Sequence, residues 1–336
     1  MDRITILGMG PLGVTIGLGL KKARLKNTEI LGTDGDSKAL KRAEQMGAID
    51  TGNGNLRSAM QGASLVIMDT PHSETREFLE AIGLILGQGT TITDTGPAKV
   101  QVTEWARQYL PHDATYVGGR PLPPHTMKTL DDVVPSGLQG AGYCVVAEAS
   151  ADPESVRTVA GMVEALGAKP VFMSPEEHDS YAAAMSHLPI ALSAALVTAL
   201  SASPGWRDMA KVVGPEFSDL SKLAALDPED NAVAFNGSSG SLAHWLDRMI
   251  AELTVYRDQV QAGGEEIMET LITAWEQLAR LESGAAAAEE SLGPPGPTMG
   301  QALGGMVVGR RLADRAKQLT DLNKHAAWRY PRRKRR

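Results

Sequence analysis

Hydrophobic positions along the chain change their spacing near residue 174. Before that point, short apolar runs alternate with stretches of helical spacing, which is the pattern of βαβ units around a mostly parallel sheet. The predicted strands are residues 4–7, 29–31, 65–68, 91–93, 143–146 and 170–172. Later, only long apolar patterns with a period near 3.6 residues remain. The sequence therefore predicts an α/β domain with a parallel sheet, followed by an all-α domain.

Composition and charge suggest three segments: an α/β domain over 1–174, a helical domain over 175–284, and a linker with a basic tail over 285–336. Residues 310–336 hold 11 Lys and Arg against 2 Asp and Glu, a net charge of +9. Because the whole chain has a net charge of −7, the remaining residues carry −16. No folded nucleic-acid module surrounds the tail, so we expect a solvated end or a contact with the acidic body.

Several protein classes can be set aside from composition. Apolar residues make up 43% and charged residues 22%, which is ordinary for a globular protein. Cys144 is the only cysteine, which excludes an intramolecular disulfide and any multi-cysteine metal site, and we expect no metal. There is no uninterrupted apolar run of about 18 residues, and a strand is predicted from residue 3 onward, so we expect neither a membrane span nor a secretory signal. The expected location is the cytoplasm.

The strongest local signal is a glycine-rich turn between the first predicted strand and an amphipathic helix. It consists of Gly8, Met9, Gly10, Pro11, Leu12 and Gly13. The first glycine of G-x-G-x-x-G permits a tight turn, the second a close approach to a pyrophosphate, and the third close packing of helix on strand. This context predicts a Rossmann dinucleotide-binding domain.

An acidic residue at the end of the second strand favours NAD over NADP. Asp34 follows Gly13 by 21 residues, where a carboxylate accepts hydrogen bonds from ribose hydroxyls and repels a 2′-phosphate. Thr70 and Pro71 follow another strand at the carboxyl edge of the sheet, where ligands bind in such folds. We therefore predict that the cofactor contacts the glycine turn, Asp34, Thr70 and Pro71.

A histidine beside a helix-interrupting proline suggests a second site. His187 lies two residues before Pro189, inside a pattern that is otherwise helical. Proline leaves the carbonyl of Met185 without its usual donor and is expected to kink the helix next to His187. The residues alone are equally consistent with a histidine that only packs in a core or an interface.

Four segments occur in the same order as in the prephenate and arogenate dehydrogenases, and the chain resembles that family over about residues 3–283. They are the glycine turn, 94–99, 118–122 and 178–189, of which Ser-His-Leu-Pro at 186–189 is the most specific. The resemblance implies an N-terminal Rossmann domain that holds NAD(P), a helical domain that forms a dimer, and a substrate cleft between them. It also implies oxidative decarboxylation of a cyclohexadienol in tyrosine biosynthesis, with hydride passing to the nicotinamide.

The chain departs from the family pattern at four positions. Pro97 replaces the serine of Asp-x-Gly-Ser-x-Lys, and Arg120 replaces the histidine that polarises the substrate hydroxyl. Ile190 replaces a second histidine, and Lys211 aligns with the arginine that binds a carboxylate. Together, these changes indicate a site adapted to another anionic substrate.

The candidate site residues follow from the resemblance and its departures. An arginine cannot act as a general base near neutral pH, so His187 or His125 is the candidate base, with Arg120 as the third predicted catalytic residue. A surface-loop role for His125 is the alternative. The residues expected to bind substrate are Ser186, Arg207 and Lys211.

The favoured function is an NAD(P)-dependent dehydrogenase similar to prephenate dehydrogenase. The alternatives are a dehydrogenase or reductase of the same fold with a different anionic substrate, and a noncatalytic dinucleotide-binding dimer. The expected partners are a small anionic substrate and a second copy of the chain, with no membrane and no nucleic acid.

Overall fold

Six parallel strands form the main sheet, in the order β3-β2-β1-β4-β5-β6. The computed structural model describes residues 2–123, 127 and 129–283. The strands are β1 (Asp2–Leu7), β2 (Thr28–Thr33), β3 (Thr51–Gly52), β4 (Ala63–Met68), β5 (Thr91–Asp94) and β6 (Thr115–Tyr116). The four predicted strands up to residue 93 are confirmed. Strands β3 and β6 were not predicted, because two residues are too few to show a period.

A separate three-stranded sheet lies next to the main one, and it corrects the prediction of a single mostly parallel sheet. It contains β7 (Gly118–Leu122), β8 (Gly142–Val146) and β9 (Lys169–Met173), with β7 antiparallel to β8 and β8 parallel to β9. Two predicted strands, 143–146 and 170–172, belong to this second sheet. Strand β7 was missed because two glycines and a proline hide its strand signal.

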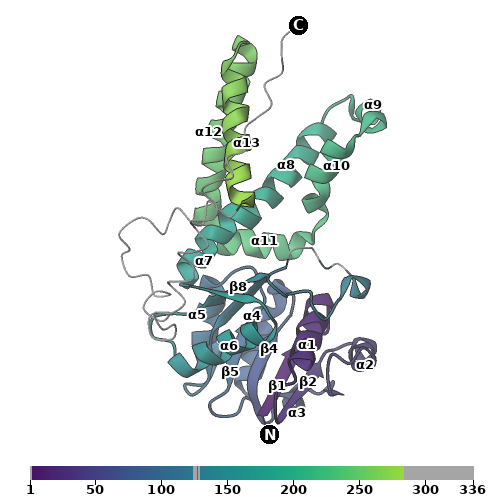
Figure 1. Ribbon diagram of the computed structural model, residues 1–336, viewed down its shortest axis with the longest axis vertical. Helices are drawn as coiled ribbons and strands as arrows, with labels where there is room; N and C mark the ends of the chain where they lie inside the picture. Colours follow the sequence, from purple (N-terminus) through teal and green to yellow (C-terminus); the bar gives the residue numbers. More distant parts are fainter. Residues whose placement is uncertain (1, 124–126, 128, 284–336) are drawn as a thin grey trace, which may run out of the picture.

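Helices cover both faces of the main sheet and enclose two apolar cores (Figure 1). They are α1 (Pro11–Ala23), α2 (Ser37–Gln45), α3 (Leu56–Met60), α4 (Thr75–Gly83), α5 (Val100–Tyr109) and α6 (Pro153–Ala165). One core includes Ile6, Ile16 and Val159, and the other includes Val66 and Ile92. Helix α6 begins after Asp152, whose side chain accepts a hydrogen bond from Ser155 N at 2.9 Å and so caps the helix.

The second half of the described chain is helical, as predicted, and no described residue after Met173 lies in a strand. Its elements are α7 (Pro175–Ala182), a π-helical turn (Ala183–His187), α8 (Leu188–Ser201), α9 (Trp206–Met209), α10 (Pro215–Ser221), α11 (Pro228–Gly237), α12 (Ser239–Ala262) and α13 (Glu266–Glu282). Short 3₁₀ turns lie at His72–Glu74, Leu130–Asp132, Ala210–Val212 and Lys222–Ala225. The predicted linker and basic tail lie outside the described residues.

The irregularity predicted beside His187 takes the form of a π-helical turn. Residues 175–201 run as one continuous helix, and the N–H of Leu188 bonds to the carbonyl of Ala183. Pro189 then lies in the first turn of α8, where its missing N–H is tolerated. π-Turns of this kind are frequent at functional sites.

The same continuous helix is long and apolar enough to cross a membrane by length and composition, with a mean hydropathy of 1.6 over its most apolar window. Polar residues are interspersed along it, so the sequence contains no uninterrupted apolar run of spanning length there. It nevertheless carries the buried side chains of His178, Asp179 and His187. It also contacts α12 and the turn at residues 222–225.

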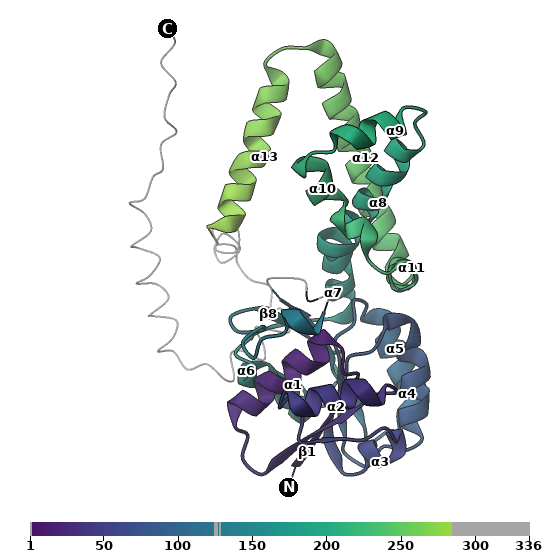
Figure 2. The same cartoon turned by 90° about the vertical axis from the view of Figure 1, so that its right-hand side faces the viewer.

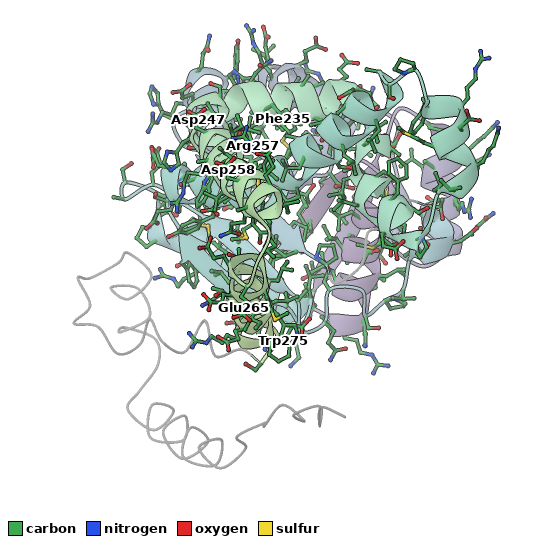
Figure 3. The ribbon with its side chains drawn as sticks, turned by 90° about the horizontal axis from the view of Figure 1, so that it is seen from above. Phe235, Asp247, Arg257, Asp258, Glu265 and Trp275 are labelled. Atoms are coloured by element: carbon green, nitrogen blue, oxygen red, sulfur yellow. The ribbon has the colours of Figure 1, made fainter. Side chains whose placement is uncertain are left out.

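The helical region has a small core of its own and a large exposed apolar surface. Among the described residues, its buried apolar cluster consists of Ala183, Leu188 and Leu242. The hairpin of α12 and α13 extends away from the sheets (Figures 1 and 2). In Figure 3, Trp275 lies on α13 at the outer side of this region. Large apolar side chains exposed on the two helices are Ile250, Leu253, Val255, Val260, Met268, Leu271, Ile272, Trp275, Leu278 and Leu281.

Candidate active site

The glycine turn has the close packing that its motif requires. Gly8 has φ of +100°, and a Cβ placed there would lie 1.9 Å from the carbonyl oxygen of Asp69. A Cβ at Gly13 would lie 2.2 Å from the carbonyl oxygen of Gly8. Side chains are therefore excluded at both positions by backbone atoms. Asp34 reaches the same turn, since Met9 N donates to its Oδ2 at 2.7 Å.

A cavity of about 510 Å³ opens beside this turn, at the carboxyl edge of the main sheet. Its lining residues are Leu7, Gly8, Gly10, Thr33, Asp34, Gly35, Gly54, Leu56, Asp69, Thr70, Pro71, Glu74 and Phe78. Five of the predicted cofactor residues therefore lie around one cavity. The side chain of Met9 does not, because it is 2% exposed and packs in the core. Pro11 and Leu12 begin helix α1 next to the turn.

Successive contacts between residues connect this cavity to the helical region. His72 directly follows Pro71, and its Nδ1 lies 3.6 Å from the position of a Cβ on Gly96. The next residue, Pro97, accepts a hydrogen bond at its carbonyl from Arg120 Nη1 at 3.3 Å. Arg120 Nη2 donates to Ser186 Oγ at 2.8 Å. Two predicted site residues from distant segments, Arg120 and Ser186, are thus in direct contact.

Arg120 is a partly buried cation, and the carboxylates of Asp94 and Asp179 act on its charge from nearby without pairing with it. Among the described residues it forms no ion pair, and its hydrogen bonds there go to a carbonyl and a hydroxyl. Burial lowers the pKa of the guanidinium, but an arginine stays charged at neutral pH. Removing a charge even partly from water is costly unless it is paired, so this position favours an anionic ligand.

A buried ion pair holds the loop that presents Pro97. Lys99 Nζ donates to Asp94 Oδ2 at 2.6 Å and to the carbonyl of Gly96 at 2.8 Å, and both charged side chains are almost inaccessible. The other carboxylate oxygen of Asp94 accepts from Tyr116 Oη at 2.8 Å and from Gly119 N at 3.1 Å. Strands β5, β6 and β7 are therefore joined at one carboxylate.

His187 is held in a tautomer that can accept a hydrogen bond. Its Nδ1 lies 2.8 Å from Ser238 Oγ, and that hydroxyl donates to the carbonyl of Ala234 at 3.0 Å. The imidazole must therefore donate through Nδ1, which leaves a lone pair on Nε2. This Nε2 is buried without a partner in the described residues. Burial and the nearby charge of Arg120 lower the pKa of His187 to about 4.

Two further buried histidines, His178 and His72, lie in the same region. His178 Nδ1 is 2.7 Å from Asp179 Oδ1, and Asp179 also accepts from the backbone N–H groups of Lys99 and Val100. Burial lowers the pKa of His178, and likewise that of His72. The Nε2 of His178 and both ring nitrogens of His72 have no partner in the described residues. His178 and Asp179 begin the segment 178–189 on which the family resemblance rests.

Arg207 and Lys211, which were predicted to bind substrate, do not lie near Arg120 of the same chain. Arg207 lies on α9 and Lys211 in the following turn, beyond the far end of α8 (Figure 1). Helix α8 has 14 residues, which corresponds to about 20 Å. Lys211 is exposed and pairs with Asp208 at 2.6 Å. His125 lies outside the described residues.

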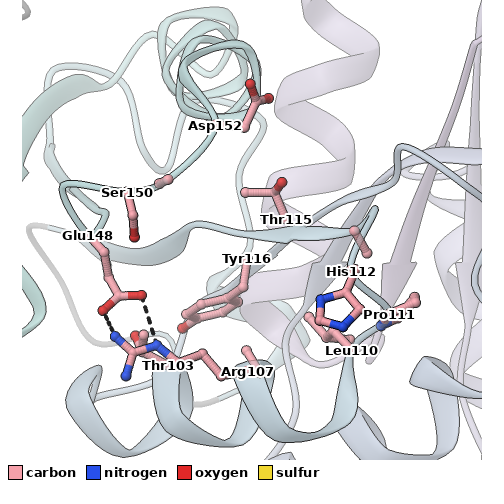
Figure 4. A pocket seen from close by; sticks show the side chains of 13 residues that line it. Thr103, Arg107, Leu110, Pro111, His112, Thr115, Tyr116, Glu148, Ser150 and Asp152 are labelled. Atoms are coloured by element: carbon pink, nitrogen blue, oxygen red, sulfur yellow. Dashed lines mark hydrogen bonds and ion pairs between the residues drawn. The ribbon is translucent and has the colours of Figure 1, made fainter.

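A second cavity, of about 550 Å³, lies between α5, β6 and residues 148–152 (Figure 4). Arg107 and Glu148 form an ion pair at its side. It contains none of the predicted site residues, and we do not assign it to the site. Among the described residues, no group of three or more His, Cys, Asp or Glu side chains is arranged to hold a metal.

Comparisons with known proteins identify the relatives of the chain. The family model for the prephenate dehydrogenase nucleotide-binding domain matches residues 16–172, and the model for the prephenate dehydrogenase dimerization domain matches residues 174–274. Prephenate dehydrogenase of Bacillus subtilis is 28% identical over 229 residues, and that of Lactococcus lactis subsp. cremoris is 30% identical over 230 residues. Each match covers 68% of this chain but 62% of the relative.

Solved structures show the same fold. Prephenate dehydrogenase from A. aeolicus, in complex with hydroxyphenyl propionate and NAD⁺, has a TM-score of 0.75 and 24% identity, covering 84% of this chain and 98% of that chain. Synechocystis arogenate dehydrogenase has a TM-score of 0.65 and 20% identity, covering 86% and 99%.

The fold and the site define a two-domain protein in which a nucleotide-binding α/β domain meets a helical domain at a buried polar site. Both family models match in order and together span most of the chain. The chain belongs to the prephenate dehydrogenase family.

The neutral state of His187 should make the folded protein sensitive to acid. Its pKa is about 4 in the folded chain and about 6.5 in an unfolded one, so the unfolded state binds more protons between these values. Stability is therefore complete above about pH 6.5 and is lost as the pH falls toward 4. We expect His187 to account for about 1 kcal/mol of the stability lost between pH 7 and pH 5, after allowance for solvent screening.

Urea unfolding at pH 7 and pH 5 tests this expectation. His187→Gln should reduce the loss on acidification, whereas His244→Gln, a change at an exposed position, should leave it unchanged. An equal loss for His187→Gln and the unsubstituted protein would contradict the assignment.

Proposed function

We propose that the protein is an NAD-dependent dehydrogenase whose cofactor binds in the cavity beside the glycine turn. The observation that carries this proposal is the glycine turn at the cavity, where backbone atoms exclude side chains at Gly8 and Gly13 and Gly8 and Gly10 line the open space. The start of helix α1 supplies backbone N–H donors for phosphate. NAD, when bound, supplies the hydride acceptor. The NAD⁺ complex of the A. aeolicus relative supports the choice of cofactor.

The charges of the cavity favour NAD over NADP. Asp34 lies at its edge, and Asp69 and Glu74 also line it, while no described lining residue is Lys or Arg. A 2′-phosphate would meet negative charge without a cation to bind it. The carboxylate of Asp34 instead suits ribose hydroxyls.

At the other end of the site, we propose that Arg120 holds an anionic group and His187 accepts a hydroxyl hydrogen. The free Nε2 of His187 is an acceptor, and part of the lowering of its pKa comes from the charge of Arg120. An anion bound to Arg120 would offset that charge and make His187 a stronger base. Ser186, already bonded to Arg120, would contribute to the substrate site. The role of His125 stays a prediction.

The reaction class proposed is oxidation at a hydroxyl-bearing carbon, with prephenate or arogenate as the first substrates to test. Relatives of this chain include a prephenate dehydrogenase from B. subtilis and another from L. lactis subsp. cremoris. The resemblance noted above implies that loss of carbon dioxide follows hydride transfer. The cytoplasmic location, and the absence of membrane and nucleic-acid partners, stay predictions.

A second candidate is a dehydrogenase of the same architecture that takes another anionic substrate. The observation that favours it is Arg120, whose guanidinium occupies the place of the family's hydroxyl-polarising histidine. A guanidinium forms two parallel bonds to a carboxylate but cannot take up a proton. The site would then bind a carboxylate where relatives bind a hydroxyl.

We also propose that two copies of the chain associate through the helical region. The match to the dimerization-domain model supports this, as does the exposed apolar surface of α12 and α13. Burying apolar surface of this kind is the main driving force of stable association. A second copy is also the means by which Arg207 and Lys211 could approach a substrate site.

Gly13→Ala should weaken NADH binding by at least about tenfold, or about 1.4 kcal/mol, because the added Cβ would meet the carbonyl oxygen of Gly8. Gly161→Ala is the control and should keep the native affinity, since Gly161 lies on α6 outside the cavity lining and a Cβ there meets nothing within 4 Å. Titration followed by NADH fluorescence gives both affinities. Wild-type affinity in Gly13→Ala would refute the proposed site, as would failure of the native protein to bind NADH.

Formation of NADH with prephenate and with arogenate tests the substrate and the role of Arg120. Arg120→Ala should raise KM for the anionic substrate by about 10- to 100-fold, the cost of one charge-assisted contact. Arg120→Lys keeps the positive charge but loses the two parallel N–H donors of the guanidinium, so its KM should lie between those of the native protein and Arg120→Ala. If Arg120→His turns over prephenate or arogenate and the native protein does not, the result would favour the second candidate. Equal KM values in all variants would refute the role of Arg120.

Sedimentation of the native protein should show a dimer. Leu271→Asp should shift it toward monomer, because Leu271 is 54% exposed on the apolar face of α13 and a carboxylate there would be buried in the interface. Glu276→Gln, on the same helix, is the control and should remain dimeric. A native protein that sediments as a monomer would overturn the proposed association.

A further inference from the structure

Asp69 places a carboxylate directly at the turn proposed to bind the cofactor phosphates. It follows strand β4, and its Oδ2 accepts a hydrogen bond from Gly13 N, at the start of helix α1, at 2.7 Å. The same oxygen lies 3.8 Å from the position of a Cβ on Gly10. Its Oδ1 accepts from Thr95 Oγ1 at 2.6 Å. The carboxylate therefore occupies one of the backbone donors that such a turn offers to an anion.

Other titratable groups around Asp69 are acidic or neutral. Asp34 from the end of β2 and Glu74 from the turn after β4 line the same cavity. Tyr143 from β8 is close enough for the charge of Asp69 to raise its pKa. Asp94, next to Thr95, directs its carboxylate to Lys99. No described residue lining the cavity is Lys or Arg, so an ionised Asp69 has no cation to offset it there.

A pyrophosphate that binds at this turn would meet an ionised carboxylate at the start of α1. Like charges at such close range destabilise each other by an amount that grows with burial. Burial already raises the pKa of Asp69 above that of an exposed aspartate. A bound anion would raise it further, since a nearby negative charge disfavours the ionised form.

The surroundings of Asp69 can accommodate a proton without loss of either hydrogen bond. A carboxylic acid keeps one oxygen as acceptor for Gly13 N–H and uses its O–H as a donor. Thr95 Oγ1 can accept that proton and turn its own hydrogen toward the carbonyl of Met68, which lies 3.4 Å away. The neutral form is therefore as well satisfied as the ionised one.

We propose that Asp69 takes up a proton from the solvent when a dinucleotide binds, so that cofactor affinity in this protein is linked to pH. The proposal rests on the proposed function, because it requires a dinucleotide in this cavity. Affinity falls with rising pH in the range where the bound form holds the proton and the free form does not. The slope there approaches tenfold per pH unit, the value for one linked proton.

NADH affinity measured by fluorescence from pH 5.5 to pH 8.5 tests the linkage in the full-length protein. We expect the native protein to bind more weakly as the pH rises. Asp69→Asn imitates the protonated acid, since its amide can accept from Gly13 N–H and donate to Thr95. This variant should bind with an affinity nearly independent of pH, and at pH 8.5 at least about tenfold more tightly than the native protein. Glu74→Gln removes a charge from the same cavity without this contact and should keep the native pH slope.

Calorimetry in two buffers of different ionisation enthalpy gives a direct readout that needs no variant. The native protein should take up a fraction approaching one proton per NADH in the range where its affinity changes. A flat native affinity with no proton uptake would overturn the linkage while leaving the proposed cofactor intact. Failure of both the native protein and Asp69→Asn to bind NADH at every pH would overturn the linkage and the proposed function together.

Discussion

The arrangement of the whole site depends on the buried ion pair between Asp94 and Lys99. Its two side chains bond to strands β6 and β7 and to the loop after β5, so the two sheets cannot move independently at this point. The backbone of Lys99 also bonds to Asp179, at the start of the helical region. Removing one member would leave an uncompensated buried charge, at a typical cost of about 3–5 kcal/mol. The pair therefore holds the position of Pro97, and through it that of Arg120.

The polar groups around this pair are better suited to a ligand than to the protein alone. Arg120 is partly buried without an ion pair in the described chain, and three nearby imidazoles keep nitrogens that have no hydrogen-bond partner there. Unsatisfied buried groups of this kind lower stability unless a ligand or water completes them. Their neutrality also follows from their surroundings, because burial and the charge of Arg120 both oppose protonation of His187. One cation thus sets both the preference for an anion and the base strength of its neighbour.

The two ends of the proposed reaction site differ in electrostatic character. The cofactor cavity is lined by carboxylates, whereas the domain junction presents a cation and neutral acceptors. Phosphate recognition in the cavity must therefore come from backbone N–H groups rather than from basic side chains. The rest of the molecule is also acidic, because the residues before 310 carry a net charge of −16. A substrate anion would therefore be attracted only by local cations near the site.

The sequence by itself determined the class of fold, the glycine turn and most of the candidate residues. These signals are local: a strand, a turn that needs glycines and a helix start are adjacent in the chain, and helical spacing is visible over short windows. Strand β7, which carries Arg120, was hidden by its glycines and proline, and the separation of the second sheet depends on long-range pairing. Only the tertiary structure brought Arg120 to Ser186, Asp69 to Gly13 and Asp179 to Lys99, because these contacts join segments 56 to 80 residues apart. The tertiary structure also places Arg207 and Lys211 away from Arg120 within one chain. Helix α8 lies between the two groups, and its direction in space cannot be read from the order of residues.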